Sequence, residues 1–309
     1  MSSAAEYRSG FVAIVGEPNV GKSTLINALV GEKVAIVAPK PQTTRNRILG
    51  VKTVPNAQIV FIDTPGVRIE REPLAKTLTR TTFGVLDSAD AVLFVMAVRF
   101  ETPRLQRHEV AVLDAVVRAK KPAILVLNKI DLLKRRDALL DWISVMKERH
   151  PFAAIVPTSA TKGDGLDGLL AEAAALLPVG QQLYPDDAYT DRPERFLVSE
   201  LVREQVILAT RDELPYSVAV RTQSFQEADA KKLVRIECSI FVERDSQKGI
   251  IIGRRGQMLR RIGEAARHEI EKLLAHHVFL GLTVKVRENW RDDEGAMRDL
   301  GIGDADGEA

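Results

Sequence analysis

Short apolar runs recur through the first 180 positions of the chain, and longer segments with helical spacing lie between them. The runs are FVAIV (11–15), AQIVFI (57–62), AVLFVMAV (91–98), AILVL (123–127) and AAIVP (153–157). The helical segments cover residues 22–30, 74–86, 105–119, 137–149 and 166–176. Continuous apolar strands that alternate with helices are typical of a parallel sheet covered on both faces. The pattern therefore predicts an α/β doubly wound domain over residues 1–180.

The pattern changes beyond residue 180. Residues 181–195 are rich in Pro, Asp and Tyr and show no apolar period. We interpret them as a linker in which Thr190 or Asp191 caps the next helix. A helix, two strands, a second helix and a third strand are then predicted over residues 195–210, 217–224, 232–244, 257–275 and 280–287. This order predicts a smaller α+β domain over residues 196–291.

Charge is divided unevenly along the chain. The formal net charge is +2, but residues 292–309 carry seven acids against Arg298 alone, which is −6 and leaves +8 for the rest. A basic body suits a polyanionic partner. We treat residues 292–309 as an acidic tail and expect its end, GIGDADGEA, to be disordered. The single cysteine, Cys238, excludes an internal disulfide, and no signal sequence or membrane-spanning run is evident, so we expect a cytoplasmic protein.

Residues 16–23, GEPNVGKS, fit the pattern G-x-x-x-x-G-K-[ST] of a phosphate-binding loop, or P-loop. The motif follows the strand FVAIV and opens the first predicted helix, as its mechanism requires. Backbone N–H groups of such a loop converge on phosphate oxygens. We expect Lys22 to neutralise the outer phosphates and the Ser23 hydroxyl to bind Mg²⁺. The residues assigned to nucleotide binding here are Gly16, Glu17, Pro18, Asn19, Val20, Gly21, Lys22, Ser23 and Thr24.

Polar residues follow three further strands. They are Asp63-Thr64-Pro65-Gly66, Asn128-Lys129-Ile130-Asp131 and Thr158-Ser159-Ala160. Ligands bind at the carboxyl ends of strands in open α/β sheets. We expect Asp63 to reach the metal and Gly66 to let the backbone approach a γ-phosphate. The Asp131 carboxylate accepts from two donors that guanine offers and adenine lacks, so this set predicts a guanine nucleotide site.

A polar segment, PKPQTTRNRILG (39–50), lies between the first helix and the strand AQIVFI. We expect the Thr44 hydroxyl to meet Mg²⁺ and the γ-phosphate of GTP, with Thr43 as the second choice. The predicted metal ligands are therefore Ser23, Thr44 and Asp63. Loss of the γ-phosphate would release this segment and the loop after Gly66, which is the usual order-to-disorder switch.

The sequence does not supply every residue expected to act on the attacking water. GTPases of the Ras kind orient this water with a glutamine near the glycine that corresponds to Gly66, but Val67 comes next here. Valine neither donates nor accepts, so we expect slow intrinsic hydrolysis. Asn19 is a candidate carbonyl ligand for a monovalent cation, which predicts faster hydrolysis in K⁺ than in Na⁺; its alternative role is to stabilise the loop. The predicted catalytic residues are Asn19, Lys22, Thr44 and Gly66.

The sequence contains two Gly-x-x-Gly brackets. GLDG (165–168) is acidic and opens a predicted helix, whereas GRRG (253–256) follows three isoleucines and precedes an amphipathic helix. Six basic residues stand against Asp245 between positions 244 and 261: Arg244, Lys248, Arg254, Arg255, Arg260 and Arg261. KH modules clamp about four nucleotides with such a loop; the alternative is a basic surface helix after a turn. The predicted RNA contacts are Lys248, Gly253, Arg254, Arg255, Gly256 and Arg260.

Aromatic residues add little to this prediction, because they make up only 5% of the chain. We assign five of them in the C-terminal domain to packing in the core or at strand ends rather than to base stacking. They are Tyr216, Phe225, Phe241, Phe279 and Trp290.

Together these motifs resemble the bacterial Era GTPases, which belong to the TrmE-Era superfamily of P-loop GTPases and carry a C-terminal KH domain. The phrases that carry the resemblance are GEPNVGKSTLINALVG, KPQTTRNRI, DTPG, NKID, TSA, TDRPERF, ELPYSVAV and QKGIIIGRRGQMLRRIG. The resemblance implies a GTP-binding domain, a type II KH domain and hydrolysis of GTP to GDP with Mg²⁺. A hydrophobic residue in place of the glutamine is also typical of this group, as Val67 is here.

The resemblance further implies a monomeric assembly factor that binds 16S ribosomal RNA near its 3′ end and assists maturation of the small (30S) ribosomal subunit. It also implies peripheral association with the inner face of the cell membrane. Two alternatives stay open from the residues themselves. One is a signalling GTPase whose C-terminal domain is an adaptor for protein or membrane, and the other is a GTPase that acts on a different RNA, for example in tRNA modification.

Overall fold

The computed structural model describes residues 6–40, 43–66, 82, 84–98, 102–135, 137–211, 214–228 and 233–302. These residues form two compact units. The first contains the described residues up to Ala35 and from Thr44 to Asp191, and the second contains those from Arg192 onward together with the segment Ile36–Thr43. Within these ranges no helix has both the length and the apolar character needed to cross a bilayer. Most of the helix predicted over 74–86, Val67, and tail residues 303–309 lie outside the described residues.

The first unit is built around a six-stranded sheet in the order β2-β3-β1-β4-β5-β6. Neighbouring strands are parallel except that β2 runs antiparallel to β3. The core strands β3, β4 and β5 are buried along their whole length, as continuous apolar runs predict. The strands are β1 (Arg8–Val15), β2 (Ile48–Val54), β3 (Ala57–Asp63), β4 (Ala91–Ala97), β5 (Ala123–Asn128) and β6 (Ala154–Pro157).

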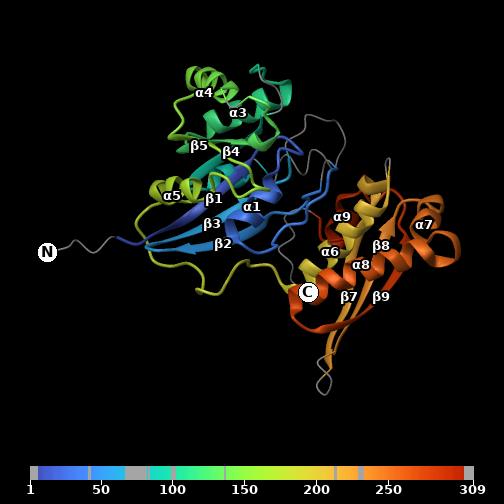
Figure 1. Ribbon diagram of the computed structural model, residues 1–309. Coiled ribbons are helices and arrows are strands. Elements are labelled where there is room, and N and C mark those ends of the chain that lie inside the picture. The colour runs from blue at the N-terminus through green and yellow to red at the C-terminus, as the bar shows by residue number, and fades with distance from the viewer. Residues whose placement is uncertain are drawn as a thin grey trace. The chain divides into compact units, whose positions relative to one another are not determined.

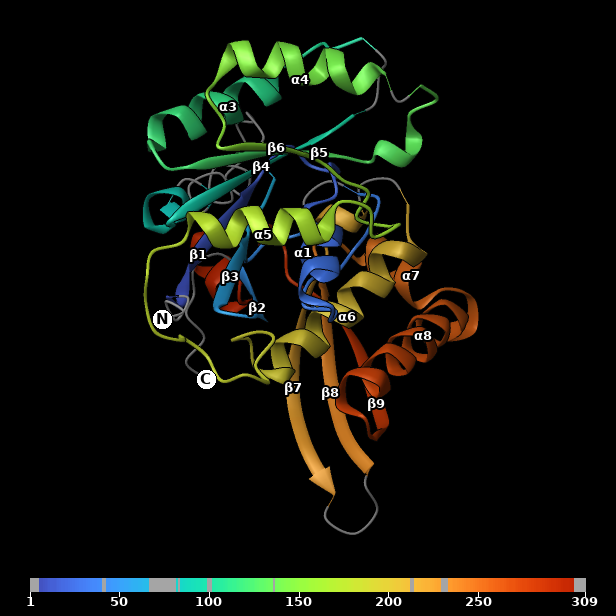
Figure 2. The ribbon, with the colours of Figure 1, turned by 60° about the vertical axis from the view of Figure 1, so that its left-hand side comes forward.

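Helices cover both faces of this sheet (Figure 2). On one side lie α1 (Lys22–Val30) and α5 (Leu166–Leu176), and on the other lie α3 (Arg107–Ala119) and α4 (Ala138–Arg149). A short 3₁₀ turn, η1 (Ile130–Leu132), follows β5. The sequence pattern had placed these helices and five of the strands, and the α/β doubly wound class is confirmed.

The sixth strand, β2, was not predicted. Residues 48–50 lie at the end of the polar switch segment predicted over 39–50, but they begin β2 and pair with the end of β3. Antiparallel pairing at an edge requires no crossover helix, and the half-buried end of β2 gives no continuous apolar run. The sheet is therefore mixed rather than wholly parallel.

The predicted linker lies against the first unit over much of its length. The side chain of Gln58, which is fully buried, accepts from the backbone N–H groups of Leu183 and Tyr184 at 2.9 and 2.8 Å. The Thr190 hydroxyl donates to Leu49 O at 2.7 Å. Thr190 therefore does not cap the next helix, which begins after Pro193 with no side-chain cap. The composition of the linker did not indicate these contacts, because most of them involve backbone groups rather than side chains.

The second unit is built on a three-stranded sheet, with three helices packed on one face and a short C-terminal helix on the other (Figure 1 and Figure 2). Strands β7 (Ala219–Ala228) and β8 (Leu233–Val242) are antiparallel, and β9 (His277–Val286) pairs parallel to β8 at the edge. The helices α6 (Glu194–Ala209), α7 (Asp245–Ile252) and α8 (Gln257–Leu274) contribute the apolar residues that pack on β8. Short 3₁₀ turns are η2 (Leu214–Ser217) and η3 (Arg254–Gly256). The α+β class predicted for this part of the chain is confirmed.

Two helices of this unit were not predicted. The isoleucines before GRRG belong to α7, where Ile251 is buried and Ile250 is exposed. At eight residues, α7 is too short to show a helical period clearly. The helix α9 (Glu294–Asp299) lies in the stretch assigned to an acidic tail, and it buries Ala296 and Met297. The acidic net charge of residues 292–309 gave no indication that Ala296 and Met297 would be buried.

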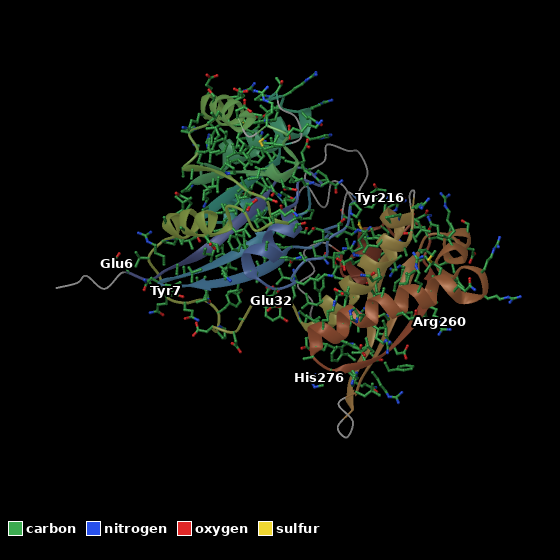
Figure 3. The ribbon with its side chains drawn as sticks, viewed as in Figure 1. Glu6, Tyr7, Glu32, Tyr216, Arg260 and His276 are labelled. Carbon is green, nitrogen blue, oxygen red and sulfur yellow. The ribbon has the colours of Figure 1, made fainter. Side chains whose placement is uncertain are left out.

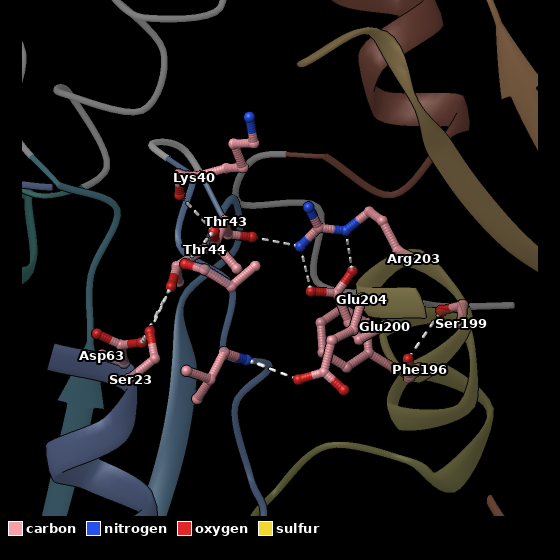
Figure 4. Close-up of polar contacts among 12 residues, drawn as sticks. Ser23, Lys40, Thr43, Thr44, Asp63, Phe196, Ser199, Glu200, Arg203 and Glu204 are labelled. Carbon is pink, nitrogen blue, oxygen red and sulfur yellow. Dashed lines mark hydrogen bonds and ion pairs between the residues drawn. The ribbon is translucent and has the colours of Figure 1, made fainter. Parts of the chain in front are cut away.

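The segment Ile36–Thr43 joins the second unit through α6 (Figure 4). The Val37 backbone N–H donates to Glu204 Oε1 at 2.8 Å, and Arg203 donates to the Thr43 backbone carbonyl. Arg203 is buried and also donates to both carboxylate oxygens of Glu200, at 2.8 and 2.6 Å. The predicted switch segment is thus divided, because Thr43 belongs to the second unit and Thr44 to the first.

Candidate nucleotide site and candidate nucleic-acid groove

The parallel register of the first sheet brings the predicted motifs to one edge. Ile14 near the end of β1 pairs with Asp63 of β3 and with Leu93 of β4. Asn128 is the last residue of β5, and the chain that leaves β6 continues directly into Thr158-Ser159-Ala160. The carboxyl ends of these strands therefore surround the loop that begins at Gly16, which is where open α/β sheets bind ligands.

Lys22 lies inside the loop that it follows in sequence. Its Nζ donates to the backbone oxygens of Gly16 at 3.1 Å and Glu17 at 3.0 Å, and only 6% of its surface is exposed. Burial lowers the pKa of the Lys22 ammonium to about 8, although the carboxylates of Asp63 and Glu17 offset part of this effect. A buried cation in a wrapped loop is placed to meet phosphate oxygens.

Three oxygen-bearing side chains meet beside Lys22. Ser23 Oγ lies 2.9 Å from Asp63 Oδ2 and 2.9 Å from Thr44 Oγ1, and Thr44 Oγ1 lies 3.2 Å from the same carboxylate oxygen (Figure 4). Burial raises the pKa of Asp63, while the Lys22 charge and the two hydroxyl hydrogen bonds lower it in part. The structure thus brings the three predicted metal ligands together.

The structure separates the two threonines of the switch segment. The Thr43 hydroxyl donates to Lys40 O at 2.6 Å and lies 3.4 Å from Ala38 O, within its own segment. Thr44 faces Ser23 and Asp63. This geometry favours Thr44 over Thr43 as the residue that meets a metal ion.

The loop after β3 lies directly against the P-loop. The Thr64 hydroxyl donates to Ile14 O at 2.7 Å, and Pro65 is buried. A Cβ at Gly66 would lie 2.8 Å from the backbone nitrogen of Pro18, closer than real Cβ contacts allow. Only glycine permits this approach, so the Gly66 backbone is held close to the loop that would carry the phosphates.

The predicted base-binding residues form a connected set. Asn128, fully buried, donates to Val20 O at 2.9 Å and accepts from the Ala160 N–H at 3.2 Å. Lys129 Nζ donates to Asn19 O at 2.7 Å. These contacts tie the P-loop to the loops after β5 and β6.

Asp131 lies at the outer side of this set. Ser159 Oγ donates to Asp131 Oδ1 at 2.6 Å, which fixes the carboxylate, and the residue is exposed. Among the described residues nothing donates to Asp131 Oδ2. An oriented carboxylate with an open oxygen can accept hydrogen bonds from a ligand.

The GRRG loop in the second unit has a conformation that its glycines make possible. Gly253 has φ 70° and ψ 178°, and a Cβ there would lie 2.6 Å from Met258 Cβ. Arg255 also has a positive φ, 50°, although it is not glycine. Arg254 and Arg255 are both exposed. The tight turn therefore presents two guanidinium groups to solvent at the start of α8.

A groove lies beside this loop, between α8 and β9. The cavity measures about 390 Å³ and is lined by Gly256, Leu259, Arg260, Gly263, Glu264, Arg267, Leu280 and Leu282. Arg260 is labelled in Figure 3; its side chain is 82% exposed, and its Nε lies 3.0 Å from Glu264 Oε1. Lys248 is half-buried on α7. Apolar walls with a charged rim suit bases inside and phosphates outside.

Sequence reasoning missed several residues of this groove. Gly263 and Arg267 follow Arg260 at positions i+3 and i+7 of α8, and that spacing places all three on one helix face. The signal was therefore available in the sequence. Leu280 and Leu282 lie inside the strand predicted over residues 280–287, but spacing along that strand does not show that it packs beside α8.

The chain was compared with known families and proteins. Residues 11–129 match the family model described as 50S ribosome-binding GTPase, and residues 213–291 match the KH domain model. GTPase Era of Geobacter metallireducens is 50% identical over 295 residues, covering 96% of this chain and 98% of that protein. GTPase Era of Lacticaseibacillus paracasei is 46% identical over 302 residues, covering 98% and 99%. The chain belongs to the Era family of GTPases.

Solved Era structures agree with this assignment. One is Era from Aquifex aeolicus, as a variant bound to GDP and aluminium tetrafluoride, with a TM-score of 0.91 and 42% identity over 96% of this chain and 99% of that one. Another is Era in complex with MgGDPNP and nucleotides 1506–1542 of 16S ribosomal RNA, with a TM-score of 0.91, 41% identity and the same coverage. The chain is a GTPase, with a P-loop GTPase domain followed by a KH domain.

Proposed function

We propose that this GTPase is a switch that binds the 3′ region of 16S ribosomal RNA and assists maturation and assembly of the small ribosomal subunit. The observation that carries the proposal is the groove between α8 and β9, bordered by the exposed arginines of the GRRG loop. Its apolar walls and cationic rim match what a KH module needs to hold single-stranded RNA. The Era structure that contains nucleotides 1506–1542 supports the choice of RNA.

We assign the nucleotide to the edge formed by the P-loop and the three strand ends. Residues 16–24 and 63–66 would surround the phosphates, with Lys22 between the loop carbonyls and the outer phosphates. Asn128 and Lys129 would brace the base-binding side, and Asp131 would accept from guanine while Ser159 and Ala160 support it. Thr44 and the Gly66 backbone would respond to the γ-phosphate.

The residues beside Lys22 fit Mg²⁺. Asp63 Oδ1 is buried and has no hydrogen-bond partner among the described residues, so this carboxylate has an oxygen to offer a cation. The hydroxyls of Ser23 and Thr44 lie within 3.2 Å of its other oxygen. Oxygen ligands of this kind are those that Mg²⁺ prefers. A bound ion would supply positive charge to the phosphate oxygens.

We propose slow intrinsic hydrolysis that K⁺ accelerates more than Na⁺. Asn19 has φ 62° and its backbone oxygen accepts from Lys129, so its backbone is held in place at the P-loop, and its side chain is exposed. Single-turnover hydrolysis measured in KCl and in NaCl tests this role, and the rate in K⁺ should be several-fold higher. Equal rates would contradict it, and Asn19→Asp should reduce the difference between the two salts.

The proposed RNA contacts are Lys248, Gly253, Arg254, Arg255, Gly256 and Arg260. We further propose that the protein acts in the cytoplasm as a monomer. Peripheral membrane association stays a prediction of the family resemblance. RNA release on GTP hydrolysis would follow if the two nucleotide states present the KH domain differently.

The test is RNA affinity in two nucleotide states. The full chain is titrated with a 3′-terminal 16S fragment in the presence of MgGDPNP or MgGDP, and we expect tighter binding with the GTP analogue. The variant Arg254→Asp/Arg255→Asp should lose at least about tenfold in affinity while GTP hydrolysis is unchanged. A matched control, Arg118→Asp/Lys147→Asp, places the same charge change on α3 and α4. Equal losses in the two double variants would contradict the groove assignment.

A further inference from the structure

The helices α6, α7 and α8 pack on one face of the sheet of the second unit. The helix α9 covers part of the opposite face, where Ala219 is buried and Arg221 donates to the Asp299 backbone oxygen at 3.0 Å. The rest of that face, along β8 and β9, is open in the described part of the chain.

Side chains alternate between the two faces of a strand. Leu280 and Leu282 of β9 line the groove on the helical side. Phe279 and Lys285, at odd positions of β9, therefore point to the opposite side.

Two aromatic rings on this face each pair with a cation on the neighbouring strand. The guanidinium carbon of Arg235 lies 5.5 Å from the Phe279 ring centroid, and Lys285 Nζ lies 6.0 Å from the Phe241 centroid. Both pairs are direct neighbours in the parallel register of β8 and β9. The pairs lie six residues apart, which is about 20 Å along a strand.

Phe279 is not a core residue, which was one of the two packing roles, core or strand end, expected from the sequence. Half of its surface, 50%, is exposed, whereas Trp290 is fully buried and Phe225 packs at the edge of the core. Cross-strand pairing accounts for a small gain in sheet stability. A single exposed ring is ordinary at a protein surface. The observation that points to a ligand is that two ring–cation pairs lie on the same face.

The open part of this face is basic. Among the described residues its cations are Arg235 and Lys285, and its acid is Glu237. Arg221 and Arg287 lie beside α9, where they donate to the backbone oxygen of Asp299 at 3.0 Å and to Asp299 Oδ2 at 2.8 Å. They are therefore not counted with the open part, whose excess is positive and suits a polyanion.

We propose that the open part of this sheet face, formed by Arg235, Phe241, Phe279 and Lys285, is a second binding surface for single-stranded RNA. Bases stack on aromatic rings and on guanidinium planes, and phosphates meet the lysine and arginine charges. A protein partner would be expected to bind a continuous apolar surface, whereas on this face aromatic rings alternate with cations. The proposal rests on the RNA binding proposed above and adds a site to it.

The position of β9 explains how one RNA reaches both surfaces. This strand is the edge of the sheet, with the groove on one of its faces and the sheet face on the other. An RNA that leaves the groove passes around a single strand to reach Phe279. Because the two ring pairs are about 20 Å apart, the occupant is a segment of several nucleotides. The RNA bound must therefore be longer than the groove alone can hold.

The experiment compares two RNAs on the full chain bound to MgGDPNP. One is a single-stranded oligonucleotide of about four to six nucleotides that fits the groove, and the other extends it by about ten to fifteen. The variant Arg235→Gln/Lys285→Gln removes two charges from the sheet face. The control, Arg211→Gln/Lys272→Gln, removes two exposed cations elsewhere in the same unit. Affinity is measured over a range of salt concentrations.

We expect the sheet-face variant to bind the longer RNA about tenfold more weakly and to reduce the slope of log affinity against log salt by about 1.4, which corresponds to two phosphate contacts. Binding of the short RNA and the rate of GTP hydrolysis should stay within twofold of the parent. The control should keep both affinities. A loss no greater than the control, or equal losses for both RNAs, overturns the proposal and leaves the face to a protein partner.

Phe279 supplies a test that does not depend on charge. Phe279→Ala should weaken binding of the longer RNA by about tenfold through lost stacking, whereas Phe279→Tyr should retain it. Thermal unfolding of both variants shows whether the sheet is intact, and Tyr guards against a variant that merely fails to fold. If Ala and Tyr bind the longer RNA equally well, the ring does not stack on a base. Failure of the parent to bind either RNA would instead remove the proposed function.

Discussion

The proposed nucleotide site and the proposed RNA groove use charge in opposite ways. Lys22, Asp63 and Asn128 are buried and hydrogen-bonded into one arrangement, so each contact acts in a medium of low polarity. Arg254, Arg255 and Arg260 are exposed, and each acts in water. A small polyanion such as a nucleotide is held by a few strong contacts in a fixed geometry. A long polyanion such as RNA is held by the sum of many weak contacts. Single substitutions should therefore matter far more in the first unit.

Replacement of Lys22 should have the largest effect. Lys22→Met keeps the length of the side chain but removes the buried cation, and two lost charge-assisted contacts of about 2 kcal/mol each correspond to about a thousandfold loss of GTP affinity. Calorimetric titration of nucleotide-free protein measures it. Lys147→Met, an exposed position on α4, is the control. Similar losses of GTP affinity in the two variants would show that the buried lysine contributes no more to GTP binding than the exposed one.

Asp131 should control the choice of base. Asp131→Asn puts an amide where a carboxylate accepts, so affinity for GDP should fall by about a hundredfold. Xanthosine diphosphate, which carries a carbonyl oxygen in place of the exocyclic amine, should bind the variant better than it binds the parent. Competition titration with the two nucleotides measures the ratio. Asp167→Asn is the matched control, and an unchanged preference in Asp131→Asn would remove this carboxylate from base recognition.

Salt concentration should change the ligand affinities of the two sites by different amounts, without any substitution. Four phosphate contacts in the groove give a slope of about −2.8, so raising KCl fourfold should weaken RNA binding by about fiftyfold. GDP affinity should change by less than about fivefold, because its contacts are buried and screened little. Both affinities are measured on the same preparation. A GDP affinity that falls as steeply as the RNA affinity would break the contrast between the sites.

The two threonines of the switch segment should show the smallest and most specific effect. Thr44→Val removes a hydroxyl that faces Asp63 and Ser23, so single-turnover hydrolysis should slow by at least about tenfold while GDP affinity is kept. Thr43→Val is the control because its hydroxyl bonds Lys40 within the segment. Equal rates in the two variants would contradict the assignment of Thr44, rather than Thr43, as the residue that meets the metal ion and the γ-phosphate.

Sequence reasoning worked best where one spacing determines both structure and chemistry. GEPNVGKS follows a strand and opens a helix, and the structure places its Lys22, with Ser23 and Asp63, at the edge where strand order predicted. Buried strands were equally clear because parallel sheets require continuous apolar runs. The family and the GTPase activity are confirmed; the roles of individual residues stay predictions.

Other features could not be predicted because they depend on contacts between distant parts of the chain. The linker looked loose until Gln58 was seen to hold Leu183 and Tyr184. Phe279 looked like a core residue because its exposure depends on which face of β9 packs against the helices. The groove needed β9 beside α8, whereas sequence alone gave only the GRRG loop and its charges.

The end of the second unit has a consequence for how the chain would be degraded. Met297, Leu300 and Ile302 are buried, Asp293 accepts from the Gly295 N–H, and Asp299 is bonded to Arg287. A protease that trims residues one by one from the C-terminus would meet a buried side chain at Ile302 and another at Leu300. Trimming past this point would require α9 to detach first. The last turn of this helix would therefore slow the shortening of the second unit from this end.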